Sequence, residues 1–128
     1  MNNKTIGILG EKFAQNILKN KGYTVVNTNY HSRFGEIDII AKNDTFLAFV
    51  EVKTRNENSI GTPAEAVNSK KQLKLIKTAI DYLTKNPFNL QPRFDIMEIV
   101  IKKSEDFLVK EYTHIENAFL VEDIYEIF

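Results

Sequence analysis

Apolar residues recur along this chain with two alternating periods, which predict the order of its helices and strands. A helical period predicts one helix over residues 5–21, closed by Gly22, and a second that ends before Asn86-Pro87. Runs rich in Ile, Val, Phe and Tyr predict strands near residues 23–29, 35–42, 45–55, 93–102 and 107–115. The predicted order is therefore αβββαββ, followed by a segment that is helical from Val121 onward.

The second helix has two candidate starts in the sequence. Thr62-Pro63-Ala64-Glu65 forms a capping box with proline at the first helical position, and the residues from Ser69 to Gln72 offer another. Its predicted buried stripe consists of Leu73, Ile76, Ala79, Ile80 and Leu83. A strand, this helix and a further strand form a βαβ crossover, which predicts two parallel neighbours. We expect one α/β domain over residues 1–128, in which helices flank a mixed sheet.

The stretch 35–55 predicts a β-hairpin that turns at residues 43–44. An even-length turn there places Asp38 opposite Phe49 and diagonal to Glu51 on the neighbouring strand. Side chains alternate along a strand, so one face carries Glu36, Asp38, Glu51, Lys53 and Arg55. Three acids beside two bases on a sheet face indicate a site more readily than a device for stability.

The chemistry of this face suits a hard cation and a phosphate ester. Mg²⁺, or Mn²⁺, is often held by one or two carboxylates, so Asp38 and Glu51 would be ligands and the Val52 carbonyl a third oxygen. Lys53 could orient or deprotonate an attacking water and stabilise negative charge in the transition state. These parts suffice for phosphodiester hydrolysis. The alternative is a surface ion-pair network without catalytic function.

Composition adds little for or against this hypothesis, but the distribution of charge is informative. The chain has 17 basic and 17 acidic residues and no cysteine. We expect a cytoplasmic protein with no membrane segment, because no signal-like or membrane-spanning apolar run is present. Residues 51–85 carry seven Lys/Arg against four Asp/Glu, whereas residues 104–128 carry one against seven. A local surface for an anionic partner is compatible with zero net charge.

Nucleic acid, with DNA favoured over RNA, is the partner that this surface predicts. The predicted phosphate contacts are Arg33, Arg55, Lys70, Lys71 and Lys74. The alternative is that these side chains form only a solvated surface. Gln72 differs from its lysine neighbours, because it lies within the apolar stripe and needs a polar partner. Arg93 and Asp95 are expected to form a structural ion pair instead.

These residues together resemble the PD-(D/E)XK nucleases, and in particular the YraN family of that superfamily. The matching segments are Gly10-Glu11, Gly35-Glu36-Ile37-Asp38, Phe49-Val50-Glu51-Val52-Lys53 with Arg55, Lys71-Gln72, Arg93-Phe94-Asp95 and Ala118-Phe119. The resemblance spans residues 10–119 and implies a restriction-endonuclease-like fold, similar to that of archaeal Holliday-junction resolvases. One departure is Ile37, which stands where the superfamily name has proline.

The resemblance also implies roles by position. Asp38 and Glu51 would be metal ligands, and Lys53 the catalytic base or charge stabiliser. Glu11 would be an outer acid that helps to place metal or water, and Gln72 a helper from the second helix. From the residues alone, Glu11 remains equally a polar residue at the edge of the first helix's apolar stripe.

Three functions follow from the sequence. The first is a divalent-metal-dependent endonuclease that acts on DNA, branched or damaged DNA included. The second is a nucleic-acid-binding module with the same fold and little or no cleavage, and the third is an adaptor that uses the acidic C-terminal segment. A homodimer would suit cleavage of both strands, although the sequence carries no dimer signature.

Overall fold

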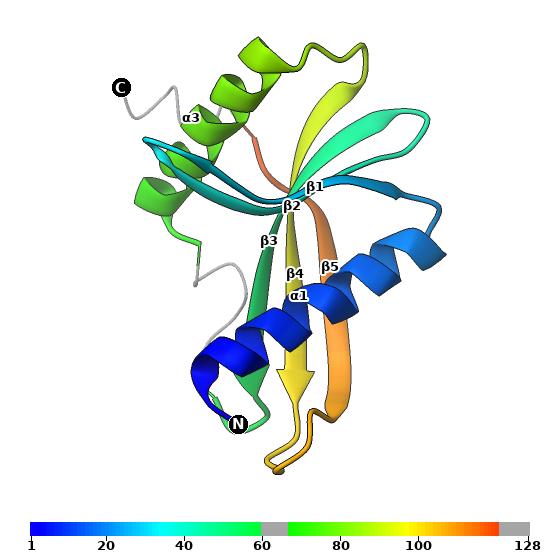
Figure 1. Ribbon diagram of the computed structural model, residues 1–128, viewed down its shortest axis with the longest axis vertical. Helices are drawn as coiled ribbons and strands as arrows, with labels where there is room; N and C mark the ends of the chain where they lie inside the picture. The colour runs from blue at the N-terminus through cyan, green and yellow to red at the C-terminus, as the bar shows by residue number, and fades with distance from the viewer. Residues whose placement is uncertain (60–66, 121–128) are drawn as a thin grey trace.

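The computed structural model describes residues 1–59 and 67–120 and confirms the α/β fold class (Figure 1). Its elements are α1 (Asn3–Asn20), β1 (Thr24–Ser32), β2 (Gly35–Lys42), β3 (Phe46–Asn56), α3 (Ser69–Lys85), β4 (Gln91–Ile101) and β5 (Val109–Phe119). This is the expected αβββαββ order. The capping box at Thr62–Glu65 and the helical segment from Val121 lie outside the described residues.

The five strands form one mixed sheet in the order β1-β2-β3-β4-β5. β3 and β4 are parallel, as expected of the crossover through α3, and the other neighbours are antiparallel. The two helices cover opposite faces of the sheet. Leu47 and Phe49 of β3 pack in the core beneath α3, while Ala48 and Val50 pack in the core beneath α1. Alternate side chains of β3 therefore pack in two hydrophobic layers, one on each face of the sheet.

α1 approaches β3 closely at Gly10. A Cβ atom placed on Gly10 would lie 1.9 Å from the Thr54 hydroxyl oxygen, so no larger residue fits without movement. Ala14 and Leu18, one and two turns further on, are fully buried against the sheet. Gly10 thus sets the height of α1 above the sheet, and it fixes the position of its neighbour Glu11.

The hairpin is confirmed, but its predicted register is wrong by two residues. Lys42 pairs with Leu47 and Ile39 with Val50, and the Asn43 N–H donates to the Phe46 carbonyl at 3.0 Å. The turn therefore centres on residues 44–45. The Asn43 side chain explains the shift, because its oxygen accepts from the N–H groups of Thr45 and Phe46. A shift of two in register leaves the paired residues, 39–42 and 47–50, on their predicted faces.

The buried face of α3 is rotated from the predicted one: Ile76 and Ala79 are buried and Leu73 and Leu83 pack against the core as predicted, but Ile80 does not. Its buried residues are Leu75, Ile76, Thr78, Ala79 and Tyr82, whereas Ile80 is 51% exposed. Asn68, rather than a Ser69 box, caps the helix by accepting from the Lys71 N–H at 3.0 Å. The predicted stripe placed Ile80 in the core because it weighed hydrophobicity alone, and it left out the aromatic Tyr82.

No helix within the described ranges is long and apolar enough to cross a bilayer.

Candidate functional site

Asp38 lies where the regular alternation of β2 breaks. Ile37 packs in the core beneath α3, yet Ile39, two residues on, packs in the core beneath α1. Between them, the Asp38 carboxylate accepts a hydrogen bond from the Val52 N–H at 2.8 Å. The regular pairing of β2 with β3 ends at Ile39 and Val50. Beyond that pair, a side-chain oxygen rather than a backbone carbonyl accepts from the backbone of β3. This contact draws Asp38 to the strand that carries Glu51.

Glu51 is buried on the α3 face of β3, next along that face from Phe49. The Lys71 ammonium, on the first turn of α3, lies 2.9 Å from the Glu51 carboxylate, and the Lys53 ammonium lies 3.8 Å from it. A pocket of about 240 Å³ opens here, lined by Gly35, Glu36, Asp38, Glu51, Lys71, Lys74 and Leu75. The structure therefore brings Asp38, Glu51 and Lys53 together, as predicted, although the first two are not diagonal neighbours.

Two further acids stand beside this pair. Glu11 reaches from α1 into a hydrogen bond with Asp38. The Asn29 side-chain amide, oriented so that its nitrogen faces acceptors, donates to Glu11 at 3.2 Å and to Glu36 at 3.1 Å. Asn29 has a positive φ of 51°, a conformation that asparagine tolerates better than most residues. No pattern in the sequence pointed to Asn29, because its role depends on how β1 pairs with β2.

Burial and neighbouring acids raise the pKa of two of these carboxyl groups, Asp38 and Glu11. Burial, and then the charge of Glu51, raise the pKa of Asp38 to about 8, although the Val52 N–H acts in the opposite sense. Burial likewise raises the pKa of Glu11. The acids therefore stand so close together that ionisation of Asp38 is disfavoured, and a divalent cation could replace the proton on Asp38. Oxygen donors of this kind suit Mg²⁺ or Mn²⁺.

The two lysines of the site shift each other's pKa in opposite directions. Burial, followed by the hydrogen bond with Lys71, lowers the pKa of Lys53. For Lys71, burial acts to lower the pKa, but the contacts with Lys53 and Glu51 raise it overall. The arrangement favours one charged amine, Lys71, that donates to a neighbouring amine, Lys53, which loses its own proton more readily. Lys53 is therefore the better proton acceptor of the two.

The other predicted site residues lie in varied surroundings. Gln72 donates to the Val67 carbonyl at 2.9 Å and so supports the start of α3, outside the residues that line the pocket. Arg55 pairs with Glu98 at 3.0 Å and donates to the Ser59 carbonyl. Lys70 is exposed on the first turn of α3. The sequence predicted that Gln72 would reach the sheet. Instead Lys71, its neighbour on the first turn of α3, contacts Glu51 of β3.

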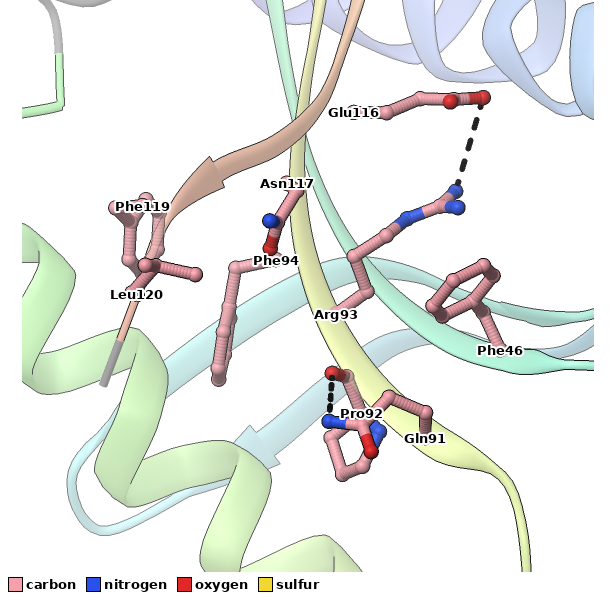
Figure 2. Close-up of a pocket in the computed structure, with 9 residues that line it drawn as sticks. All are labelled: Phe46, Gln91, Pro92, Arg93, Phe94, Glu116, Asn117, Phe119 and Leu120. Carbon is pink, nitrogen blue, oxygen red and sulfur yellow. Dashed lines mark hydrogen bonds and ion pairs between the residues drawn. The ribbon is translucent and has the colours of Figure 1, made fainter. Parts of the chain in front are cut away.

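A larger hollow, of about 520 Å³, lies at the beginning of β3 and β4 (Figure 2). Its charged wall is Arg93, which donates both to Asp95, at 2.8 Å, and to the Tyr23 hydroxyl. The Asp95 carboxylate also contacts His114 at 2.8 Å. The expected structural ion pair is thus confirmed. The charges of Arg93 and Asp95 neutralise each other, which distinguishes this hollow from the acid-rich pocket.

The αβββαββ order and the five-stranded mixed sheet define an α/β fold that matches the restriction-endonuclease-like topology expected from the sequence. Within the described residues, no three His, Cys, Asp or Glu side chains are already grouped as a metal site. Asp38 and Glu51 are the two carboxylates that could hold a cation here, and one or two carboxylates is the number that Mg²⁺ commonly takes from a protein.

Comparison with known proteins assigns the chain to a family. A family model described as "Uncharacterised protein family UPF0102" matches residues 10–99, and the chain belongs to this family. It is 45% identical over 124 residues to a UPF0102 protein of Alkaliphilus oremlandii, covering 91% of this chain and 99% of that protein. A relative from Clostridium acetobutylicum is 43% identical over 120 residues, covering 93% and 97%. Another, from Dictyoglomus thermophilum, is 46% identical over 120 residues, covering 93% and 100%.

Proposed function

We propose that this protein is a divalent-metal-dependent endonuclease that hydrolyses phosphodiester bonds in nucleic acid, DNA in particular. The observation that carries the proposal is the meeting of Asp38, Glu51 and Lys53 in and beside one pocket. Burial and mutual repulsion make that pocket receptive to a cation. The basic first half of α3 forms one side of it, which suits a polyanionic substrate. We expect the protein to act in the cytoplasm.

Asp38 and Glu51, with the Val52 carbonyl, are the groups that would hold Mg²⁺ or Mn²⁺. When bound, the cation would supply Lewis-acid polarisation of the phosphoryl group and lower the pKa of a coordinated water. Glu11 stands behind Asp38 and would orient it through their hydrogen bond.

Lys53 and Lys71 divide two tasks in this proposal. Lys53, whose pKa is lowered by burial, takes the proton from the attacking water as the new P–O bond forms. Lys71 remains charged and stabilises the additional negative charge on the phosphorane. The P–O bond to the leaving sugar then breaks, and that oxygen takes a proton from solvent. The released strand end carries the phosphate.

Removal of the Glu51 charge tests the proposal directly. We expect Glu51→Gln to lower Mg²⁺- or Mn²⁺-dependent cleavage of a labelled DNA at least 100-fold, because it removes half of the carboxylate pair. Circular dichroism should show an unchanged fold, since glutamine fills the same volume. Glu111→Gln, an exposed acid on β5, is the matched control and should cleave as the wild type does. Full cleavage by Glu51→Gln would overturn the assignment.

A second candidate function is a nucleic-acid-binding module that does not cut. The observation in its favour is the Lys71–Glu51 ion pair, which at 2.9 Å already neutralises one of the two carboxylates. Binding in Ca²⁺ together with cleavage in Mg²⁺ or Mn²⁺ separates the two candidates. Tight binding in Ca²⁺ with no cleavage in either other metal would favour the module.

A further inference from the structure

The turn between β1 and β2 carries an aromatic side chain that the hydrophobic core does not use. Phe34 is half-buried, and it belongs to neither of the two core clusters among the described residues. A large apolar side chain on a two-residue turn gains little stability from such a position. Its placement beside the acid-rich pocket indicates a different use.

The turn is fixed to the middle of α3 (Figure 1). The Ser32 hydroxyl accepts from the Phe34 N–H at 3.0 Å and donates to the Thr78 hydroxyl at 3.3 Å. Gly35, the next residue, has a positive φ of 154°, and α3 packs over it, so that an added Cβ would meet Thr78 and Lys74. Since Gly35 also lines the site pocket, Phe34 is held at the edge of that pocket.

Two cations accompany the Phe34 ring. The guanidinium carbon of Arg33 lies 4.8 Å from the ring centroid, and the Lys77 ammonium lies 5.8 Å from it. Along α3, Lys70, Lys74 and Lys77 follow one another at helical spacing, and the first acid of that helix is Asp81. Asp81 is engaged with the Tyr30 hydroxyl and with Lys85. Positive charge therefore runs from the pocket to the aromatic ring.

We propose that Phe34 is a stacking platform for an unpaired nucleobase, with Arg33 and Lys77 on its flanking phosphates. This rests on the proposed function and specifies its substrate class, namely nucleic acid with a single-stranded or extruded nucleotide next to the bond that is cut. The Arg33 guanidinium is planar, exposed and already over the ring. A base can take that place, which frees Arg33 for a phosphate. A base inside a duplex has no free face for such a contact, so duplex binding should rely on phosphate contacts alone.

Binding without metal tests this proposal independently of cleavage. The full-length protein in EDTA is titrated against fluorescein-labelled oligothymidylate and against a mixed-sequence duplex of the same length. We expect Phe34→Ala to weaken binding to the single strand about 10-fold, the range of one base–aromatic stack, and to leave duplex binding within about two-fold. Phe34→Trp should restore the single-strand affinity, whereas Phe34→Leu, which keeps apolar bulk without an aromatic face, should not.

Two controls make the outcome decisive. Tyr112→Ala removes an exposed aromatic on β5, beside Glu111, and should change neither affinity. Lys77→Gln should weaken both complexes and reduce the dependence of log K on log salt by about one unit. Equal loss of single-strand and duplex binding in Phe34→Ala, or full rescue by Phe34→Leu, would overturn the platform. A Phe34-dependent preference for single strands in a protein that never cuts would uphold it and reject the nuclease.

Discussion

At the scale of single residues, Asp38 shows how the site and the stability of the protein oppose each other. Its carboxylate is largely buried and is surrounded by Glu11, Glu36 and Glu51, which raise its pKa. A sequence selected for stability alone would not keep four acids together at this position. Glu51 and Lys53 could be placed on one face from the sequence, because side-chain alternation along β3 does not depend on the exact turn. Asp38 was predicted beside them, but the break in the alternation of β2 at this residue was not predicted. Asn29 could not, because its amide meets Glu11 and Glu36 only once β1 has paired.

Asp95 behaves in the opposite way and provides a pH-dependent prediction. Burial acts to raise its pKa, but hydrogen bonds from His114, Arg93 and the Asn117 N–H hold that pKa below the usual value of 3.8. A lowered native-state pKa contributes stability above the unfolded pKa, and that stability is lost as the pH falls through the lower value. We expect Asp95→Asn to reduce the free energy of unfolding by about 3–5 kcal/mol at pH 7, because Arg93 is left buried without its partner.

Urea unfolding of both proteins at several pH values checks this. The difference between wild type and Asp95→Asn should begin to shrink below about pH 4, where the carboxylate of the unfolded chain binds a proton, and should continue to shrink toward the lower native pKa. A difference that stays constant from pH 7 to pH 3 would show that charge at Asp95 does not support the fold.

At the scale of elements, the hairpin and α3 show what periodicity can and cannot predict. The β2–β3 turn was predicted one residue early, which displaced the register by two, yet the face of β3 that carries Glu51 and Lys53 was right, because an even shift in register preserves it. In α3, by contrast, the observed buried face is rotated about the helix axis relative to the predicted one. As a result Ile80 is exposed and Lys71 contacts Glu51. Successive residues of a helix differ in direction by about 100°. An error of one residue in the predicted orientation of α3 is therefore enough to exchange Gln72 for Lys71 at the site.

The contact between α1 and β3 gives a prediction at the same scale. Gly10→Ala should lower the free energy of unfolding by about 1–3 kcal/mol, because the new methyl group would overlap Thr54. Gly7→Ala is the matched control, because no atom lies within 4 Å of a Cβ placed there. It should stabilise the protein by about 0.5–1 kcal/mol through helix propensity. Thermal unfolding of the two variants decides the point, and equal effects would mean that α1 does not depend on this close approach.

At the scale of the whole molecule, topology brings the site together from four elements. α1 contributes Glu11, β2 contributes Asp38, β3 contributes Glu51 and Lys53, and α3 contributes Lys71. The order of elements and the parallel pairing of β3 with β4 could be predicted, because a strand–helix–strand crossover has one common outcome. The way α1 reaches the same pocket from the opposite face of the sheet could not, since it depends on the break in alternation at Asp38.

The central claim is that Asp38 and Glu51 form a cation site in the folded protein, and calorimetric titration with MnCl₂ tests it most directly. The measurement needs neither nucleic acid nor turnover. We predict saturable binding of Mn²⁺ to the wild type, at least 10-fold weaker binding to both Asp38→Asn and Glu51→Gln, and wild-type binding to Glu111→Gln. Equal Mn²⁺ affinity in all four proteins, or no binding to the wild type at millimolar metal, would contradict the account.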